Sequence, residues 1–153
     1  MRLQEHLVRS TQRALDDVCR AALAVPVDRR EWSPGGEARS VLNQMREVAL
    51  TGTWFLPILA GGSVPSGVDH QAVAQEWSTV EECVDAARES IGALCQAMAD
   101  FPDEGLEHEV HLPFGGGTVL PMSDVLALAG WNLVYHLGQI NQIQLILGDR
   151  EMH

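Results

Sequence analysis

The sequence predicts an all-α protein: a single four-helix bundle with a long crossover between helices 2 and 3 and a small β-hairpin before helix 4. Four segments of about twenty residues carry apolar residues at intervals of three and four, the period of an α-helix. The connection between the second and third segments is longer than a tight helical hairpin needs. The 153 residues are the usual size of one domain, so we expect a single domain over residues 1–153.

A proline lies at the expected C-terminal end of each of the first two helices. The first is expected over residues 2–24, where apolar residues form one stripe that Pro26 ends. The second is expected over residues 38–56, with Pro57 kinking or ending it. The connection that follows begins with a stretch rich in glycine, serine and proline at residues 61–67. A crossover between helices at opposite ends of a bundle would explain its length.

The third helix has a clear start. Ser78 and Thr79 are followed at the capping-box spacing by Glu81 and Glu82, so either hydroxyl can cap the first turn. The helix then presents one apolar face and ends near Asp100.

A change of period precedes the last helix. Apolar and polar residues alternate between residues 107 and 121, around three consecutive glycines, which predicts a short β-hairpin. Ser123 is the expected N-cap of the fourth helix, which continues to about residue 147 with Gly148 as its stop.

The fourth helix is apolar almost all round, which is typical of a helix that is buried on several sides, or that is buried on one side and covered by a partner chain on the other. Trp131, Leu145 and Ile146, together with Trp54 and Phe55, exceed what one bundle core should consume. We therefore expect a two-fold homodimer. The alternative is that the hairpin and the crossover fold over this surface within one chain.

The charge balance excludes two classes of partner. The chain carries 10 basic and 21 acidic residues, a net charge of −11. A surface this negative repels phosphate backbones and anionic lipid, so we expect neither nucleic acid nor a membrane as partner. The longest apolar run, residues 54–60, is too short to span a bilayer. The first residues lack the apolar core of a signal peptide, which predicts a cytoplasmic protein.

The candidate site residues of the fourth helix are Asn132, His136 and Gln139, whose spacing of four and three places them on one stripe. Polar groups inside so apolar a helix need partners, because an unpaired buried polar group is costly. One interpretation is an internal hydrogen-bonded network in which His136 bonds a carbonyl or a carboxylate. The other is a ligand site at the bundle core that faces a polar residue of another helix.

Glu47 is the candidate facing group, because it lies among apolar residues of the second helix. A carboxylate opposite Asn132 and His136 would form a divalent metal site with open coordination positions. The alternative is an exposed Glu47, paired with Arg46 or another neighbour. Periodicity leaves both open, and we predict that Glu47, Asn132 and His136 converge in one polar pocket between the second and fourth helices.

The last helix also resembles a known family. Residues 132–143, Asn-Leu-Val-Tyr-His-Leu-Gly-Gln-Ile-Asn-Gln-Ile, with Leu-Gly-Asp at residues 147–149, look like the last helix of the DinB-like (DinB/YfiT) bundle proteins. The stretch Trp-Ser-Pro at residues 32–34, Arg-Ser at residues 39–40, and Glu47 resemble the loop and second helix of that family. The order of four helices with a long middle crossover is similar too, so the resemblance covers nearly the whole chain.

The resemblance implies a divalent metal between the second and fourth helices. Characterised members include thiol-dependent isomerases and S-transferases, in which the metal activates a low-molecular-weight thiol. The family pattern has one histidine on the second helix and His-x-x-x-His on the fourth. Here Glu47 and Asn132 take two of these positions, and only His136 matches. The expected metal ligands are thus Glu47, His136 and the weaker Asn132, for zinc, nickel or manganese bound more weakly than by three histidines.

Two functions follow from these observations. In the first, the protein binds a divalent metal or a small ligand between helices 2 and 4. The catalytic form of this function is a metal-dependent, thiol S-transferase-like enzyme. In the second, it is a non-catalytic homodimeric binding or structural protein with a degenerate metal site. The two substituted ligand positions favour the second function. A carboxylate facing a buried histidine favours the first.

Overall fold

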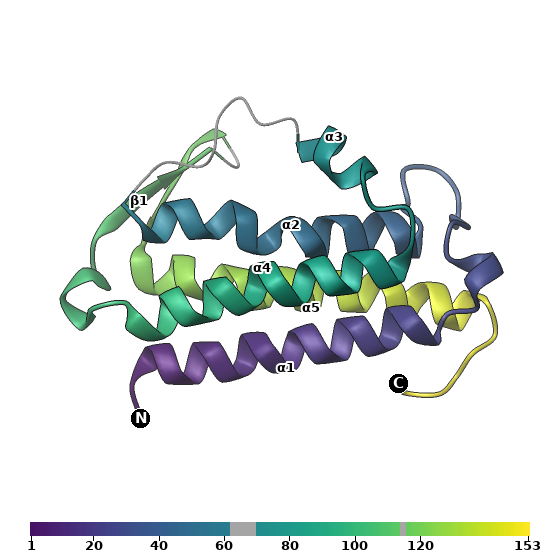
Figure 1. The fold of residues 1–153 in the computed structure, drawn as a ribbon, viewed down its shortest axis with the longest axis horizontal. Coiled ribbons are helices and arrows are strands. Elements are labelled where there is room, and N and C mark those ends of the chain that lie inside the picture. The colour runs from purple at the N-terminus through teal and green to yellow at the C-terminus, as the bar shows by residue number, and fades with distance from the viewer. Residues whose placement is uncertain (62–69, 114–115) are drawn as a thin grey trace.

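The computed structural model describes residues 1–61, 70–113 and 116–153, and in these residues four long helices lie side by side as one bundle (Figure 1). The long helices are α1 (Leu3–Ala24), α2 (Val41–Leu59), α4 (Val80–Asp100) and α5 (Met122–Ile146). The predicted mostly helical bundle with a small antiparallel hairpin is therefore confirmed. None of the described helices is long and apolar enough to cross a membrane.

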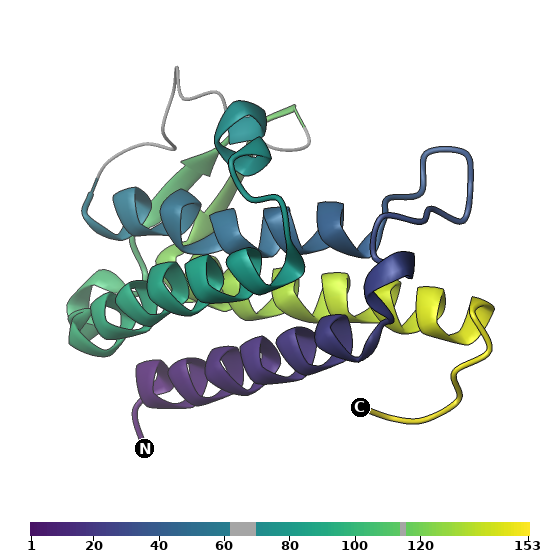
Figure 2. The ribbon, with the colours of Figure 1, turned by 45° about the vertical axis from the view of Figure 1, so that its right-hand side comes forward.

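The order of the helices accounts for the long middle connection. The chain runs along α1, returns along α2, and then runs along α4 in the same direction as α2 before α5 turns back (Figure 1). The end of α2 and the start of α4 thus lie at opposite ends of the bundle. The described part of this connection contains a short helix that the sequence did not predict, α3 (His70–Gln75), which packs against α2 (Figure 2). Most of the predicted glycine- and proline-rich stretch, residues 62–67, lies outside the described residues.

Capping explains where α2 and α4 start. Helix α2 begins three residues later than predicted, because the Ser40 hydroxyl accepts a hydrogen bond from the Asn43 amide at 3.2 Å. At α4 the cap is Thr79: its Oγ1 accepts from the Glu82 amide at 3.1 Å, and the Glu82 carboxylate accepts from the Thr79 amide at 3.1 Å. At its other end, α2 continues two residues beyond Pro57.

The prediction that Ser123 caps the last helix is wrong. Helix α5 begins at Met122, and Pro121 stands at the N-cap position. The backbone amides of Met122 and Ser123 donate to the carbonyls of His108 and Leu106, both at 2.9 Å. Because the preceding loop already satisfies these first-turn amides, the helix start needs no side-chain cap.

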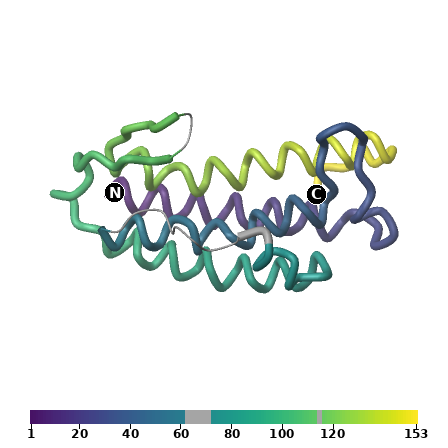
Figure 3. Tube along the Cα trace, turned by 90° about the horizontal axis from the view of Figure 1, so that it is seen from above, coloured from purple at the N-terminus to yellow at the C-terminus, as the bar shows by residue number. Residues whose placement is uncertain are grey.

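The hairpin before α5 is confirmed. Strand β1 (Glu109–Leu112) pairs antiparallel with β2 (Thr118–Pro121), with Leu112 opposite Thr118. It lies at the end of the bundle where α1 begins (Figure 3). Leu112 is buried against the apolar residues of that end of the bundle, including Phe55 and Leu126.

Helices α2 and α4 approach each other closely at Gly52. A Cβ atom at this position would lie 2.2 Å from the Ser90 carbonyl oxygen, so only glycine fits without a shift of the helices. The Ser90 hydroxyl donates to the Ala49 carbonyl of α2 at 2.9 Å, which ties the two helices together at the same level.

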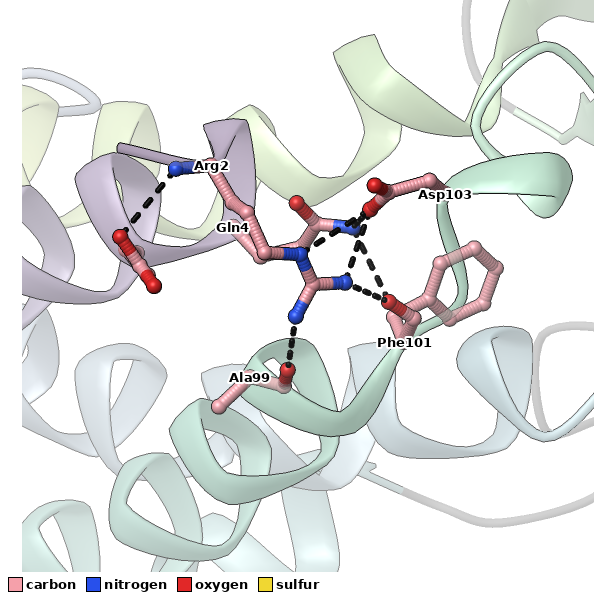
Figure 4. Close-up of polar contacts among 6 residues, drawn as sticks. Arg2, Gln4, Ala99, Phe101 and Asp103 are labelled. Atoms are coloured by element: carbon pink, nitrogen blue, oxygen red, sulfur yellow. Dashed lines mark hydrogen bonds and ion pairs between the residues drawn. The ribbon is translucent and has the colours of Figure 1, made fainter.

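Polar contacts hold the start of α1 to the end of α4 (Figure 4). The buried Gln4 amide donates to Asp103 Oδ1 at 2.7 Å and to the Phe101 carbonyl at 3.0 Å. The Arg2 guanidinium donates to the same two oxygens and to the Ala99 carbonyl. Hydrogen bonds from Arg2 and Gln4 hold the pKa of Asp103 below its ordinary value. This cluster joins the chain segments at one end of the bundle.

Candidate functional site

The centre of the candidate site is His136 of α5, which is buried against α2. Its Nδ1 lies 2.5 Å from the side-chain oxygen of Gln44, and the Gln44 amide nitrogen donates in turn to the side-chain oxygen of Gln139. Both His136 and Gln44 are 1% exposed. Of the two sequence-based interpretations, the hydrogen-bonded network is thus present, and the carbonyl that bonds His136 is that of the Gln44 side-chain amide.

This network determines which ring nitrogen of His136 carries the proton. The Gln44 oxygen can only accept, so the hydrogen of a neutral imidazole resides on Nδ1 and the lone pair on Nε2. Nε2 lies 3.4 Å from Glu47 Oε2. A lone pair and a carboxylate oxygen, both acceptors, therefore face each other between α2 and α5.

The buried position keeps His136 neutral. Burial lowers the pKa of His136 to about 4, and the positive charge of Arg39 acts in the same direction. At neutral pH no proton on Nε2 relieves the contact between the two acceptors. This is the state in which an imidazole binds a metal ion.

Glu47 is half exposed and has a second partner. Its side chain is 48% exposed, and its Oε1 forms an ion pair with the guanidinium of Arg39, which precedes α2. The alternative of an exposed Glu47 paired with Arg46 or another neighbour thus matches in exposure and in the presence of an ion pair, with Arg39 as the partner. Arg46 instead donates to the Trp77 carbonyl and to the Asn43 side-chain oxygen, both at 3.0 Å. The Arg39 cation already compensates the charge that Glu47 would offer a metal.

Asn132, one turn before His136 on α5, bonds to α2. Its amide nitrogen donates to Thr51 Oγ1 at 3.1 Å, and the Thr51 hydroxyl donates to the Glu47 carbonyl at 3.3 Å. Glu47, Thr51 and Asn132 all line one pocket. The structure thus brings Asn132 close to the Glu47 segment of α2, with His136 behind it in the core.

The pocket between α2, α3 and α5 has a volume of about 930 Å³, within the size range of small-molecule sites. Most of its lining is apolar, and the charged residues in the described part of the lining are Arg39, Arg46 and Glu47. His136 is not part of the lining, so Glu47 and Asn132 are the predicted ligands that border the pocket itself.

The donor set fits a weakly held ion. Two ligand atoms about 2.1 Å from a tetrahedral ion lie about 3.4 Å apart. This matches the distance from His136 Nε2 to Glu47 Oε2. However, the described residues contain no group of three histidine, cysteine, aspartate or glutamate side chains that could hold a metal. One imidazole, one carboxylate and one neutral amide, with a competing arginine, form a weak set of ligands.

Two residues that shape this site, Gln44 and Arg39, are not among the predicted site residues. Gln44 orients His136, and it could have been found as a polar residue three positions before Glu47, on the same helix face. Arg39 pairs with Glu47 from outside the helix, in the residue before the Ser40 cap. No periodic pattern includes a residue in that position.

Comparison with known proteins identifies the fold. No protein-family model and no curated protein matches the sequence. Among solved structures, YfiT from Bacillus subtilis, described as a probable metal-dependent hydrolase with an unusual four-helix bundle topology, has a TM-score of 0.78 at 11% identity, over 95% of this chain and 88% of YfiT. A DinB-like protein from Bacillus subtilis has a TM-score of 0.69 at 14% identity, over 97% of this chain and 95% of that one.

A third similar structure is larger. The mycothiol-dependent maleylpyruvate isomerase has a TM-score of 0.72 at 15% identity, over 92% of this chain. The match covers 61% of the isomerase, so this chain spans less than two thirds of its length. At these levels of identity the similarity establishes the fold alone, so the activity has to be inferred from the residues of the site. The chain has the four-helix-bundle fold of the DinB/YfiT-like proteins.

Proposed function

We propose that this protein binds a divalent metal ion between α2 and α5, with His136 Nε2 and a Glu47 carboxylate oxygen as ligands, beside a pocket for a small organic molecule. The observation that carries the proposal is the His136 lone pair facing the Glu47 carboxylate at 3.4 Å. Two facing acceptors can bind one cation between them, and such an ion would share Glu47 with Arg39, which pairs with its other carboxylate oxygen. The probable metal dependence of the structurally similar YfiT supports the same function.

The residues around the ligands suit this role. Gln44 and Gln139 hold the imidazole ring in one orientation and in one tautomer, as supporting residues of metal sites do. Asn132 would be the third, weaker ligand. A divalent ion bound here would polarise a substrate or lower the pKa of a bound thiol or water. The thiol dependence of the maleylpyruvate isomerase makes a small thiol one candidate for the pocket, in an S-transferase-like reaction.

Arg39 sets the strength of metal binding. Because its guanidinium already pairs with Glu47, an ion must share or displace this partner. We therefore expect weaker binding than at a three-histidine site. We also expect Arg39→Gln to strengthen metal binding, whereas Glu47→Ala and His136→Ala abolish it.

Thermal melts of the tag-free protein with zinc, nickel or manganese test this proposal. At a metal concentration ten times Kd, binding adds about 1.4 kcal/mol, which raises Tm by about 3–6 °C. The increase should be larger in Arg39→Gln and absent in Glu47→Ala and His136→Ala. The exposed Glu89→Ala on α4 serves as the control and should keep the full increase. Melts unaffected by all three metals, or an increase that persists in both ligand variants, would overturn the assignment.

We propose a second role, a homodimer formed through α5, on a separate observation. The outer side of α5 exposes large apolar side chains, at Trp131 63%, Leu145 56%, Val134 55%, Ile146 50% and Tyr135 49%. Residues 125–148 contain no charged side chain if the buried His136 is neutral. Two copies of a chain with a net charge of −11 can approach each other best through such an uncharged face. Phe55 does not contribute, because it is buried in the core of its own chain.

Light scattering over a concentration series should give a mass near twice 16.7 kDa. Leu145→Glu should shift the protein to one chain, because a two-fold interface would bury the new charge twice. Leu23→Glu introduces the same charge at a partly exposed leucine of α1 and should leave the dimer intact. A mass of one chain at every concentration of the unmodified protein rules the dimer out.

A further inference from the structure

The charged residues of the pocket differ in whether they have a partner of opposite charge. Arg39 and Glu47 pair with each other, whereas Arg46 makes no ion pair with any described residue. Its guanidinium donates through Nε to the Trp77 carbonyl and through Nη1 to the Asn43 side-chain oxygen, both at 3.0 Å. Both acceptors are neutral. Among the described residues that line the pocket, two arginines and one glutamate therefore give a net positive charge, in a strongly acidic protein.

The two hydrogen bonds of Arg46 also orient it. The bond to Trp77 connects α2 to the segment just before α4, the bond to Asn43 lies within α2, and together they hold the guanidinium at the pocket wall. A guanidinium has five N–H donors, and these contacts use two of them. An arginine held in advance loses less conformational entropy when it binds a ligand, and its planar fork matches a carboxylate.

The rest of the lining selects for an apolar ligand body. The pocket wall formed by α2 and α5 contains large apolar side chains, namely Leu50, Trp54, Phe55, Leu128 and Trp131. Aromatic side chains in such a wall favour a flat or branched hydrocarbon group. The volume of about 930 Å³ is far larger than a simple inorganic anion needs.

We infer that the pocket binds a small organic carboxylate, whose acid group pairs with Arg46 and whose apolar body lies against the aromatic wall of α2 and α5. The inference concerns the pocket of the proposed function and names the class of its organic ligand. It does not require the metal, because Arg46 is not one of the proposed metal ligands.

Calorimetric titrations of the full chain with three probes, in EDTA and at about 0.15 M salt, test this inference. Naphthalene-2-carboxylate has both the acid and the apolar body, naphthalene-2-carboxamide lacks the charge, and acetate lacks the body. We expect the first to bind at least tenfold more tightly than either of the others. Arg46→Gln should remove this preference for the acid over the amide, and Arg46→Lys should retain part of it.

Arg13→Gln is the matched control, because it changes the net charge equally at a residue of α1 that is 87% exposed. It should bind naphthalene-2-carboxylate like the unmodified protein. Equal affinity of the unmodified protein for the acid and the amide would overturn the inference, even if Arg46→Gln failed to fold. Binding of the acid that needs added metal and is unchanged in Arg46→Gln would overturn it too, while upholding the metal site. Binding in EDTA without any metal-induced rise in Tm would uphold the inference and contradict the metal site.

Discussion

Gly52→Ala is expected to destabilise the protein by about 3 kcal/mol, the upper part of the range for added volume in a packed core. The new Cβ would lie 2.2 Å from the Ser90 carbonyl oxygen and 2.3 Å from its carbonyl carbon, both backbone atoms that cannot rotate away. Helices α2 and α4 would have to separate. Thermal melts followed by circular dichroism should show Tm lower by about 6–12 °C.

Gly92→Ala is the matched control within α4. A Cβ at Gly92 meets nothing within 4 Å, so the substitution adds only helix propensity. We expect it to leave stability unchanged or to raise it by up to about 1 kcal/mol. Equal stability of Gly52→Ala and Gly92→Ala would contradict the close approach of α2 and α4 at Gly52.

The stability of the metal-free protein should fall as the pH decreases from about 6.5 to about 4, because of His136. In the unfolded chain this imidazole takes up a proton near its ordinary pKa of 6.5, whereas in the folded protein its pKa is about 4. Between these values the unfolded state binds more protons, so acid favours unfolding. The full difference corresponds to about 3 kcal/mol, reached near pH 4.

Urea unfolding between pH 7 and pH 4 in EDTA measures this effect. His136→Gln removes the titrating group, so its free energy of unfolding should depend less on pH than that of the unmodified protein over this range. Among the described residues, the charged groups that act on His136 are Glu47 and Arg39, and both remain in the variant. Parallel curves for the two proteins, or a proton NMR titration of His136 with a midpoint above pH 6, would contradict the prediction.

Local signals account for the parts of the fold that the sequence predicted well. The spacing of apolar residues that predicts α1, α2, α4 and α5 involves only residues close in sequence. The capping box at Thr79 likewise needs only a glutamate three residues later. The start of α5 was misjudged because its first amides bond to the loop carbonyls of Leu106 and His108. That bonding depends on where the hairpin places the loop, which local preferences do not specify.

The amphipathic pattern does not show which large apolar side chains are buried and which are exposed. The sequence indicated a surplus of apolar residues, and α5 does expose Trp131, Leu145 and Ile146. It could not separate these from Phe55, which is buried with Leu112 and Leu126 at the hairpin end of the bundle. Only the packed arrangement decides which large side chains share a core.

By itself, the sequence determined the helical class, the hairpin, and the alignment of Asn132, His136 and Gln139 on one stripe of the last helix, because helix geometry follows from spacing along the chain. The tertiary structure decided how these side chains are used. It set the tautomer of His136 through Gln44, paired Glu47 with Arg39, and left Arg46 without a counterion among the described residues. Each of these outcomes depends on distances between segments remote in sequence, and such distances arise only when the helices pack.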